Sequence, residues 1–193
     1  MKKIKLFLLV TLFCCAVFRV TAAPVILDDH TWSFLQIGIV PDAVALVPSD
    51  IPVFGINAEF FCGMQQRVGI INFQPVVGIT DVLKGVSFQG FGFNGETEGV
   101  AVGVSTFHDW FCGVNLAAVT GARENHGFQV GVLNLSGKCA PAQKSDAPEP
   151  PAARGVQLGV INCASNGFQV GVLNYNAGSL IPVTLLFNFS IAK

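Results

Sequence analysis

An octapeptide of the form Gly-x-Gln-x-Gly-x-x-Asn decides the fold of this chain. It reads GFQVGVLN at Gly127–Asn134, GVQLGVIN at Gly155–Asn162 and GFQVGVLN again at Gly167–Asn174. The third copy begins twelve positions after the second, whereas the second begins twenty-eight positions after the first. Removing the segment Lys138–Ala153, which is rich in Pro, Ala and charge, makes the two spacings equal. Self-similarity at a fixed period indicates a repeat architecture with one surface insertion.

Each copy alternates as a β-strand does, because successive strand residues point to opposite faces. In the first copy one face carries Phe128, Val130 and Val132, and the other carries Gln129, Gly131 and Leu133. The same alternation runs through residues 183–192, and β-branched and aromatic residues are enriched throughout. Turn-forming residues follow the copies at Cys163–Asn166 and Tyr175–Gly178. A unit of this length therefore predicts one strand of about eight residues and a turn of about four.

These units predict an all-β fold, an antiparallel repeat meander that closes or nearly closes into a barrel. The unit is shorter than the repeats of most β-solenoids, about 20 residues or more, so a β-solenoid is kept as the alternative. Closure would remove two open sheet edges, and a bulky face turned outward matches an outer-membrane barrel. Weaker copies upstream indicate one repetitive domain over residues 23–193, with the insert at 138–153.

The first 22 residues read as an export signal. Lys2, Lys3 and Lys5 form a basic n-region, and residues 6–18 form an apolar h-region. We expect signal-peptidase cleavage after the small residue Ala22. A lipoprotein signal ending at Cys14 or Cys15 is the alternative, although bulky residues precede Cys14.

The amino-acid composition argues against nucleic-acid binding and favours an apolar partner. The chain has 193 residues, of which 51% are hydrophobic and 12% are charged, whereas soluble domains carry about 25% charged residues. Four of the 11 basic residues lie in the signal, which leaves 7 basic against 12 acidic residues, a net charge of −5. Since no basic patch is present, we expect no nucleic-acid partner. An apolar partner such as outer-membrane lipid fits better, and no protein or glycan partner can be named.

Four cysteines remain after the signal: Cys62, Cys112, Cys139 and Cys163. An even number in an exported chain predicts disulfides, and their spacing does not suit zinc. We favour Cys139–Cys163, which would close the base of the insert. We also favour Cys62–Cys112, because both cysteines share a (Phe/Trp)-Phe-Cys-Gly context.

The repeat residues are predicted to be structural. The glutamines share one register and predict an amide ladder with hydrogen bonding between neighbouring strands. The asparagines receive the same structural interpretation at strand ends, where turn geometry is tolerated, and the glycines are assigned to the repeat as structural residues. The set comprises Gln129, Gly131, Asn134, Gln157, Gly159, Asn162, Gln169, Gly171 and Asn174.

Residues that might carry chemistry have simpler interpretations. The Gly90–Gly95 segment satisfies G-x-G-x-x-G, but a valine-rich strand follows where a dinucleotide site needs a helix. His108 is interpreted as a surface histidine, because no partner stands at triad or ligand spacing. Glu59 and Arg67 lie near apolar runs and could be partners inside a barrel. No catalytic residue, metal ligand or cofactor site is predicted.

The Gly-x-Gln-x-Gly-x-x-Asn unit resembles the repeat of the bacterial surface-repeat proteins of Leptospira and other Gram-negative groups, a family of unknown function. The resemblance rests on Gly127–Asn134, Gly155–Asn162 and Gly167–Asn174. It implies an envelope or surface location and supplies no catalytic residues. The insert and the cysteines depart from the simple array.

The sequence thus predicts a non-enzymatic envelope or surface protein, structural or pore-like, in a Gram-negative-type outer membrane. The first alternative is a soluble, surface-displayed β-repeat module for binding or adhesion. The second is a secreted enzyme whose site is assembled from loops.

Overall fold

The computed structural model describes residues 32–41, 44–140 and 154–190. The predicted signal at 1–22 and most of the insert at 138–153 lie outside these residues.

The described chain is all-β and forms one mixed sheet of nine strands with the order β2-β1-β3-β4-β5-β6-β7-β8-β9. The strands are β1 (Ser33–Val40), β2 (Val44–Ala45), β3 (Val53–Glu59), β4 (Cys62–Val68), β5 (Ile71–Asn125), β6 (Phe128–Ser136), β7 (Val156–Ala164), β8 (Gly167–Asn176) and β9 (Val183–Ser190), with a 3-10 turn, η1 (Gly137–Cys139), after β6. The sheet is not closed, because its end strands β2 and β9 are not neighbours.

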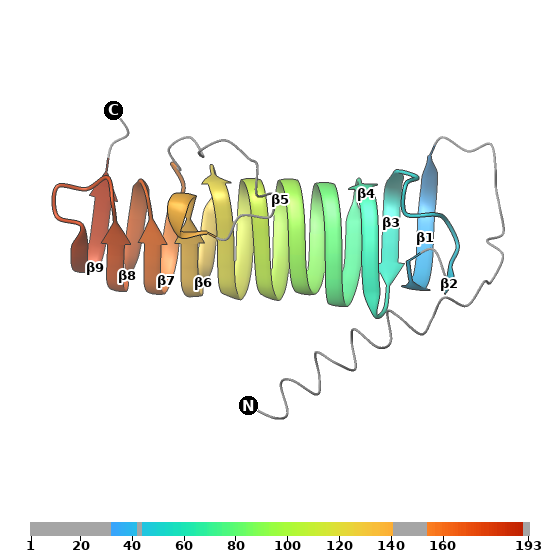
Figure 1. Ribbon diagram of the computed structural model, residues 1–193, viewed down its shortest axis with the longest axis horizontal. Coiled ribbons are helices and arrows are strands. Elements are labelled where there is room, and N and C mark those ends of the chain that lie inside the picture. The colour runs from blue at the N-terminus through green and yellow to red at the C-terminus, as the bar shows by residue number, and fades with distance from the viewer. Residues whose placement is uncertain (1–31, 42–43, 141–153, 191–193) are drawn as a thin grey trace, which may run out of the picture.

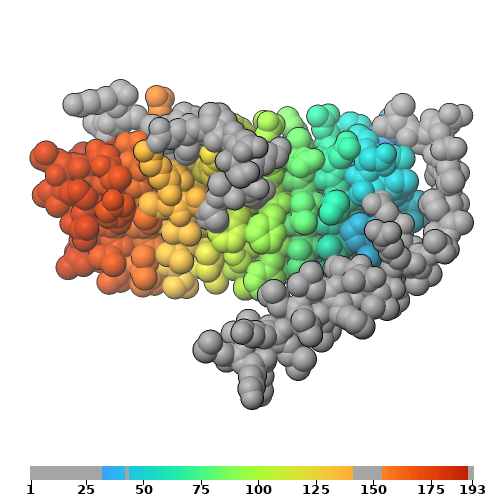
Figure 2. Space-filling model, viewed as in Figure 1, coloured from blue at the N-terminus to red at the C-terminus, as the bar shows by residue number. Residues whose placement is uncertain are grey.

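Strand pairing is parallel except at the two ends of the sheet, so the predicted antiparallel meander is wrong for the strands in between. Ile56 pairs with Ile71, Val114 with Phe128, and Gln157 with Gln169. Apart from the offset of 28 between β6 and β7, which includes the insert, the sequence offset between stacked partners shortens along the chain from 15 to 14 and then to 12. The parallel pairing follows from the path of the chain, because β5 winds through several coils stacked along the long axis (Figure 1). Figure 2 shows that the coils follow one another in chain order.

Each coil runs up one flank of the rod and down the other, turning at two edges (Figure 1). One repeat unit completes a whole coil because glycine allows close stacking at the turns. A Cβ on Gly171 would meet the carbonyl oxygen of Gly159, and one on Gly159 would meet that of Gly131. At the other edge Gly99 and Gly113 have φ of 136° and 141°, values that side chains other than glycine rarely adopt. The sequence interpretation took a whole coil for a single strand and its turn.

Polarity in the coils that contain β6, β7 and β8 is reversed relative to an ordinary soluble domain. Gln129, Asn134 and Ser136 point inward and are buried, whereas Phe128 and Val132 are exposed. The predicted alternation holds from Phe128 to Val130 but is interrupted at the turn. The prediction that the repeat asparagines lie at strand ends is therefore wrong, because they lie within strands and inside the rod.

The two ends of the rod differ from its middle. At one end, Gln36 of β1 donates a hydrogen bond to the Val47 carbonyl oxygen (2.9 Å) and accepts one from the Val47 N–H (2.7 Å). At the other end, β9 reverses direction and pairs antiparallel with β8, with an irregular register near Gly171. Leu186 has a φ of 70° at that irregularity.

Candidate functional site

A ladder of glutamine amides runs through the interior of the last three full coils. Gln157 donates from Nε2 to Oε1 of Gln129 (3.0 Å), and Gln169 donates to Oε1 of Gln157 (2.8 Å). All three side chains are buried. The parallel register of β6, β7 and β8 places them one above the other, so the shared register did predict hydrogen bonding between equivalent glutamines.

A second ladder of asparagine amides faces the first from the opposite flank. Asn134 donates from Nδ2 to Oδ1 of Asn162 (2.7 Å), which donates in the same way to Asn174 (2.7 Å). Thr120 extends the ladder by donating to Oδ1 of Asn134 (2.7 Å). Buried amides without partners cost several kcal/mol. Each internal member of these ladders meets that demand through the coil before it and the coil after it.

A third ladder in the first coils ends at a buried carboxylate. Gln89 donates to Oε1 of Gln74 (2.8 Å), and Gln74 donates to Oε2 of Glu59 (2.8 Å). Asn57 also donates to Oε2 of Glu59 (3.0 Å). The amide dipoles therefore align toward the negative end of the ladder, an arrangement in which hydrogen bonds strengthen one another. Gly63 makes room for it, because a Cβ there would meet Glu59 Oε2 at 2.5 Å.

The coil between these ladders is packed differently. Ala101, Phe111 and Ala122 form a small cluster of buried apolar side chains. His108 packs against Phe111 with ring centroids 4.8 Å apart, and its Nδ1 lies 2.9 Å from the hydroxyl of Thr97. The prediction of a surface histidine is wrong, because His108 is only 1% exposed. Burial lowers the pKa of His108 to about 3, so the ring is neutral at ordinary pH.

The cysteines bear out one of the two favoured disulfides. Cys139 of η1 is bonded to Cys163 of β7, with Cα atoms 6.0 Å apart, and this confirms the bond at the base of the insert. The predicted Cys62–Cys112 disulfide is wrong. Cys62 of β4 pairs with Val77 of β5 near one edge of the coil. Cys112 directly precedes Gly113 at the opposite edge, so their similar sequence context does not place the two cysteines together.

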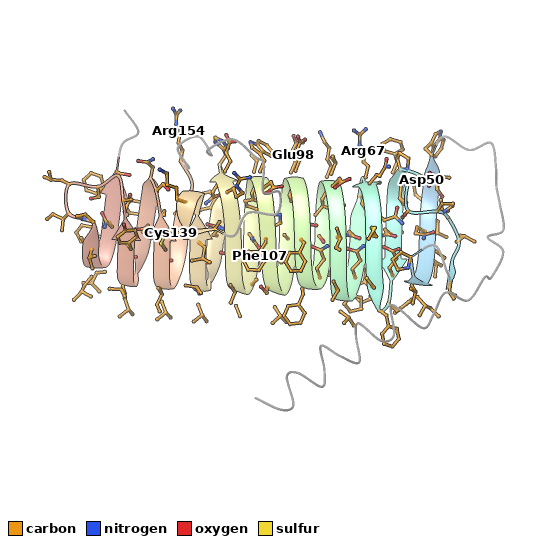
Figure 3. The ribbon with its side chains drawn as sticks, viewed as in Figure 1. Asp50, Arg67, Glu98, Phe107, Cys139 and Arg154 are labelled. Atoms are coloured by element: carbon orange, nitrogen blue, oxygen red, sulfur yellow. A yellow bond between two sulfur atoms is a disulfide. The ribbon has the colours of Figure 1, made fainter. Side chains whose placement is uncertain are left out.

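Charged side chains gather at one edge of the rod, which we call the charged edge. It consists of Asp50, Arg67, Asp81, Lys84, Glu96, Glu98, Asp109, Arg123, Glu124, His126 and Arg154. Figure 3 shows Asp50, Arg67, Glu98 and Arg154 along this edge. Neighbouring coils place opposite charges close together, as for Lys84 and Glu98 (3.0 Å). Glu59 is inside the rod and Arg67 is exposed, so the predicted pairing of these two residues is wrong.

The opposite edge carries apolar residues, and we call it the apolar edge. It consists of Phe60, Phe61, Pro75, Val76, Phe91, Val104, Ala118, Val132, Val160 and Val172. Several of these side chains are well exposed, with Val172 at 62% and Phe61 at 64%. The two flanks also present large apolar side chains, among them Ile71, Phe73, Phe128 and Phe168 on one flank and Met64, Ile79, Ile161 and Leu173 on the other.

The described residues offer no arrangement for catalysis that we can recognise. They contain no group of three or more His, Cys, Asp or Glu side chains placed to hold a metal ion. Gly90–Gly95 lies within β5, where no helix follows to receive a phosphate. His126 Nε2 lies 2.7 Å from Glu124 Oε1 on the charged edge, at hydrogen-bond distance.

Sequence reasoning missed the two edges, although a signal for them was present. Asp109 follows Asp81 by two coil lengths of β5, and Arg123 follows Asp109 by one. Charge recurring at the coil period would have placed these residues on one edge.

The chain matches no protein-family model, no curated protein and no solved structure. Within the described part of the chain, no helix has both the length and the hydropathy that crossing a membrane requires.

Proposed function

We propose that this chain is a non-enzymatic structural protein of the bacterial envelope, built as a β-solenoid and associated with lipid. The observation that carries the proposal is the reversed polarity of the coils, with amides inside and large apolar side chains outside. A soluble monomer rarely exposes apolar patches beyond a few hundred Å². An apolar surface on both flanks and one edge therefore favours an apolar environment.

The interior favours a structural role over a pore-like one. Side chains such as Gln157 and Asn162 are hydrogen-bonded across the centre of the stack to the coils on either side. A channel would need those positions to be lined by groups that face water. The ladders instead tie neighbouring coils together toward both ends of the rod, which suits a rigid rod.

Cell fractionation tests this proposal. The full chain, with its own N-terminus, is expressed in a Gram-negative host, and membranes are washed with alkaline carbonate before detergent extraction. We expect recovery in the outer membrane fraction and release by detergent alone. A monomer in the soluble periplasmic fraction would contradict the proposal and favour the surface-displayed binding module.

Gel mobility before and after heating in detergent distinguishes the proposed β-solenoid from a closed barrel. A closed outer-membrane barrel shifts its mobility on heating because it resists detergent until heated. We expect the stacked coils to give a different result, namely no barrel-like shift. A clear shift would show that the chain closes into a barrel in the membrane and would contradict the β-solenoid.

A further inference from the structure

We propose that the rod lies flat in one leaflet of a lipid bilayer, with the apolar edge toward the bilayer centre and the charged edge at the headgroups. This inference rests on the proposed lipid association and adds the lipid-facing surface and its orientation. The occupant of the apolar surface is the hydrocarbon of a single leaflet.

The separation of charge from apolar residues within each coil gives the orientation. In the coil that contains β7, Arg154 lies at the charged edge and Val160 at the apolar edge. The same order recurs in the coil that contains Glu98 and Val104. Because these coils point their charges the same way, the rod is amphipathic across its width from Asp50 to Arg154.

The width of a coil matches the depth of a leaflet. The strand from Val156 to Val160 crosses from one edge to the other, which at about 3.3 Å per residue is roughly 15 Å. The hydrocarbon core of a bilayer is about 30 Å thick, so one leaflet offers about 15 Å. A rod of this width would fill one leaflet without crossing the second.

The backbone is compatible with hydrocarbon at the apolar edge. β5 is continuous from Ile71 to Asn125 and passes through both edges, so its peptide groups pair with neighbouring coils along the rod. Polar side chains are turned into the interior ladders. Unsatisfied backbone groups are what exclude most irregular structure from lipid, and the middle of the rod avoids them.

Lipid explains the apolar surface better than a second copy of the chain. A symmetric dimer through one flank would cover residues such as Phe128 and Phe168, but it would leave the other flank and the apolar edge exposed. Hydrocarbon covers both flanks and the edge at once, while the charged edge stays in contact with water.

Binding of the purified full chain to vesicles of phosphatidylethanolamine and phosphatidylglycerol tests the orientation. Val132 is exposed at the apolar edge, so Val132→Asp should leave the fold intact, as circular dichroism will report. We expect partitioning to weaken about 50-fold, from the cost of a carboxylate in hydrocarbon. Cys112→Asp places the same charge on the charged edge and should change partitioning less than about threefold.

Depth measurements provide an independent readout. Cysteines replacing Val132 or Glu98, in a chain whose Cys14, Cys15, Cys62 and Cys112 are changed to Ser, carry a fluorophore into vesicles with brominated acyl chains. We expect strong quenching at position 132 and little at position 98. Equal quenching at both positions would overturn the orientation.

The outcomes separate this inference from the proposed function. If the wild type binds vesicles and both Asp variants bind equally well, the orientation is overturned while lipid association stands. If the wild type neither binds vesicles nor fractionates with membranes, the proposed function fails as well. Self-association that vesicles do not alter would assign the apolar flanks to second copies and overturn the inference.

Discussion

The last three full coils and the coil around His108 differ in the side chains that fill their interiors. In the last coils, Gln157 and Asn162 fill the interior with amides that bond to their equivalents above and below. Around His108, Phe111 and two alanines form an apolar cluster beside buried polar side chains such as Thr97 and Asn115. The difference shows that the same coil geometry accommodates a ladder of amides or a mixed interior with an apolar cluster.

The apolar coil should be the more sensitive to loss of volume. Phe111 is fully buried, so Phe111→Ala removes a large side chain from a rigid cluster and should lower the free energy of unfolding by about 4 kcal/mol. Denaturant unfolding in detergent micelles measures this. The matched control is Phe128→Ala at an exposed position, which should cost less than about 1.5 kcal/mol because it gives up little buried apolar area. Equal costs would mean that Phe111 is not packed inside.

The polar coils should be the more sensitive to loss of a hydrogen-bonding group of similar size. Gln157→Leu leaves Gln169 Nε2 without its Gln157 acceptor and removes a donor from Gln129. The variant removes the hydrogen bonds that join Gln157 to Gln129, Ser136 and Gln169. At about 1 kcal/mol for each bond, we expect a loss of about 3 kcal/mol by the same unfolding assay.

Leu158→Gln is the control for the ladder, because Leu158 is the exposed neighbour of Gln157 in β7. It should change stability by less than about 0.5 kcal/mol. If Gln157→Leu were neutral or stabilising, the ladder would not be required for the stacking of coils.

Acid should destabilise the protein through the coil around His108. The pKa of this ring falls from 6.5 to about 3 on folding. Between these pH values His108 is therefore protonated in the unfolded chain and neutral in the folded chain. Stability contributed by the neutral ring is fully present above pH 6.5 and is lost as the pH falls toward 3, at about 1.4 kcal/mol per pH unit. Between pH 6 and pH 5 we expect a loss of about 1 kcal/mol.

Replacement of the ring isolates this effect. His108→Gln should flatten the dependence of the unfolding midpoint on pH between 6.5 and 3, whereas His126→Gln on the charged edge should leave most of it in place. A dependence that survives His108→Gln unchanged would assign the acid sensitivity to other groups.

The sequence predicted strands and the glutamine ladder, and the reason is local. A residue that recurs at one position of a repeat, as Gln129, Gln157 and Gln169 do, must meet its equivalents if repeats are neighbours. The Cys139–Cys163 disulfide followed from the same register. Both predictions needed only the order of the repeats, which is the same for parallel and antiparallel neighbours.

The direction of pairing and the interior of the coil could not be read in the same way. Two turns within a single repeat depend on glycines such as Gly159 and Gly171 stacking against backbone, a contact between coils that no single copy reveals. Once the turns are missed, Asn162 is placed at a strand end. His108 was placed at the surface because no partner stands near it in the sequence, whereas its contacts with Thr97 and Phe111 form inside the rod. The apolar exterior was expected of a barrel, and it arises here from a different path of the chain.

Cross-linking of engineered cysteine pairs tests the parallel stacking of coils most directly. In β7 and β8, parallel stacking places Leu158 beside Val170, whereas an antiparallel hairpin turning at residues 164–167 would place it opposite Leu173. All three positions are exposed. In a chain with Cys62→Ser and Cys112→Ser, a short bifunctional thiol reagent should join Leu158→Cys to Val170→Cys within one chain, as peptide mass mapping will show, and leave Leu158→Cys with Leu173→Cys largely unlinked. The opposite preference would contradict the stacked coils and restore the antiparallel meander.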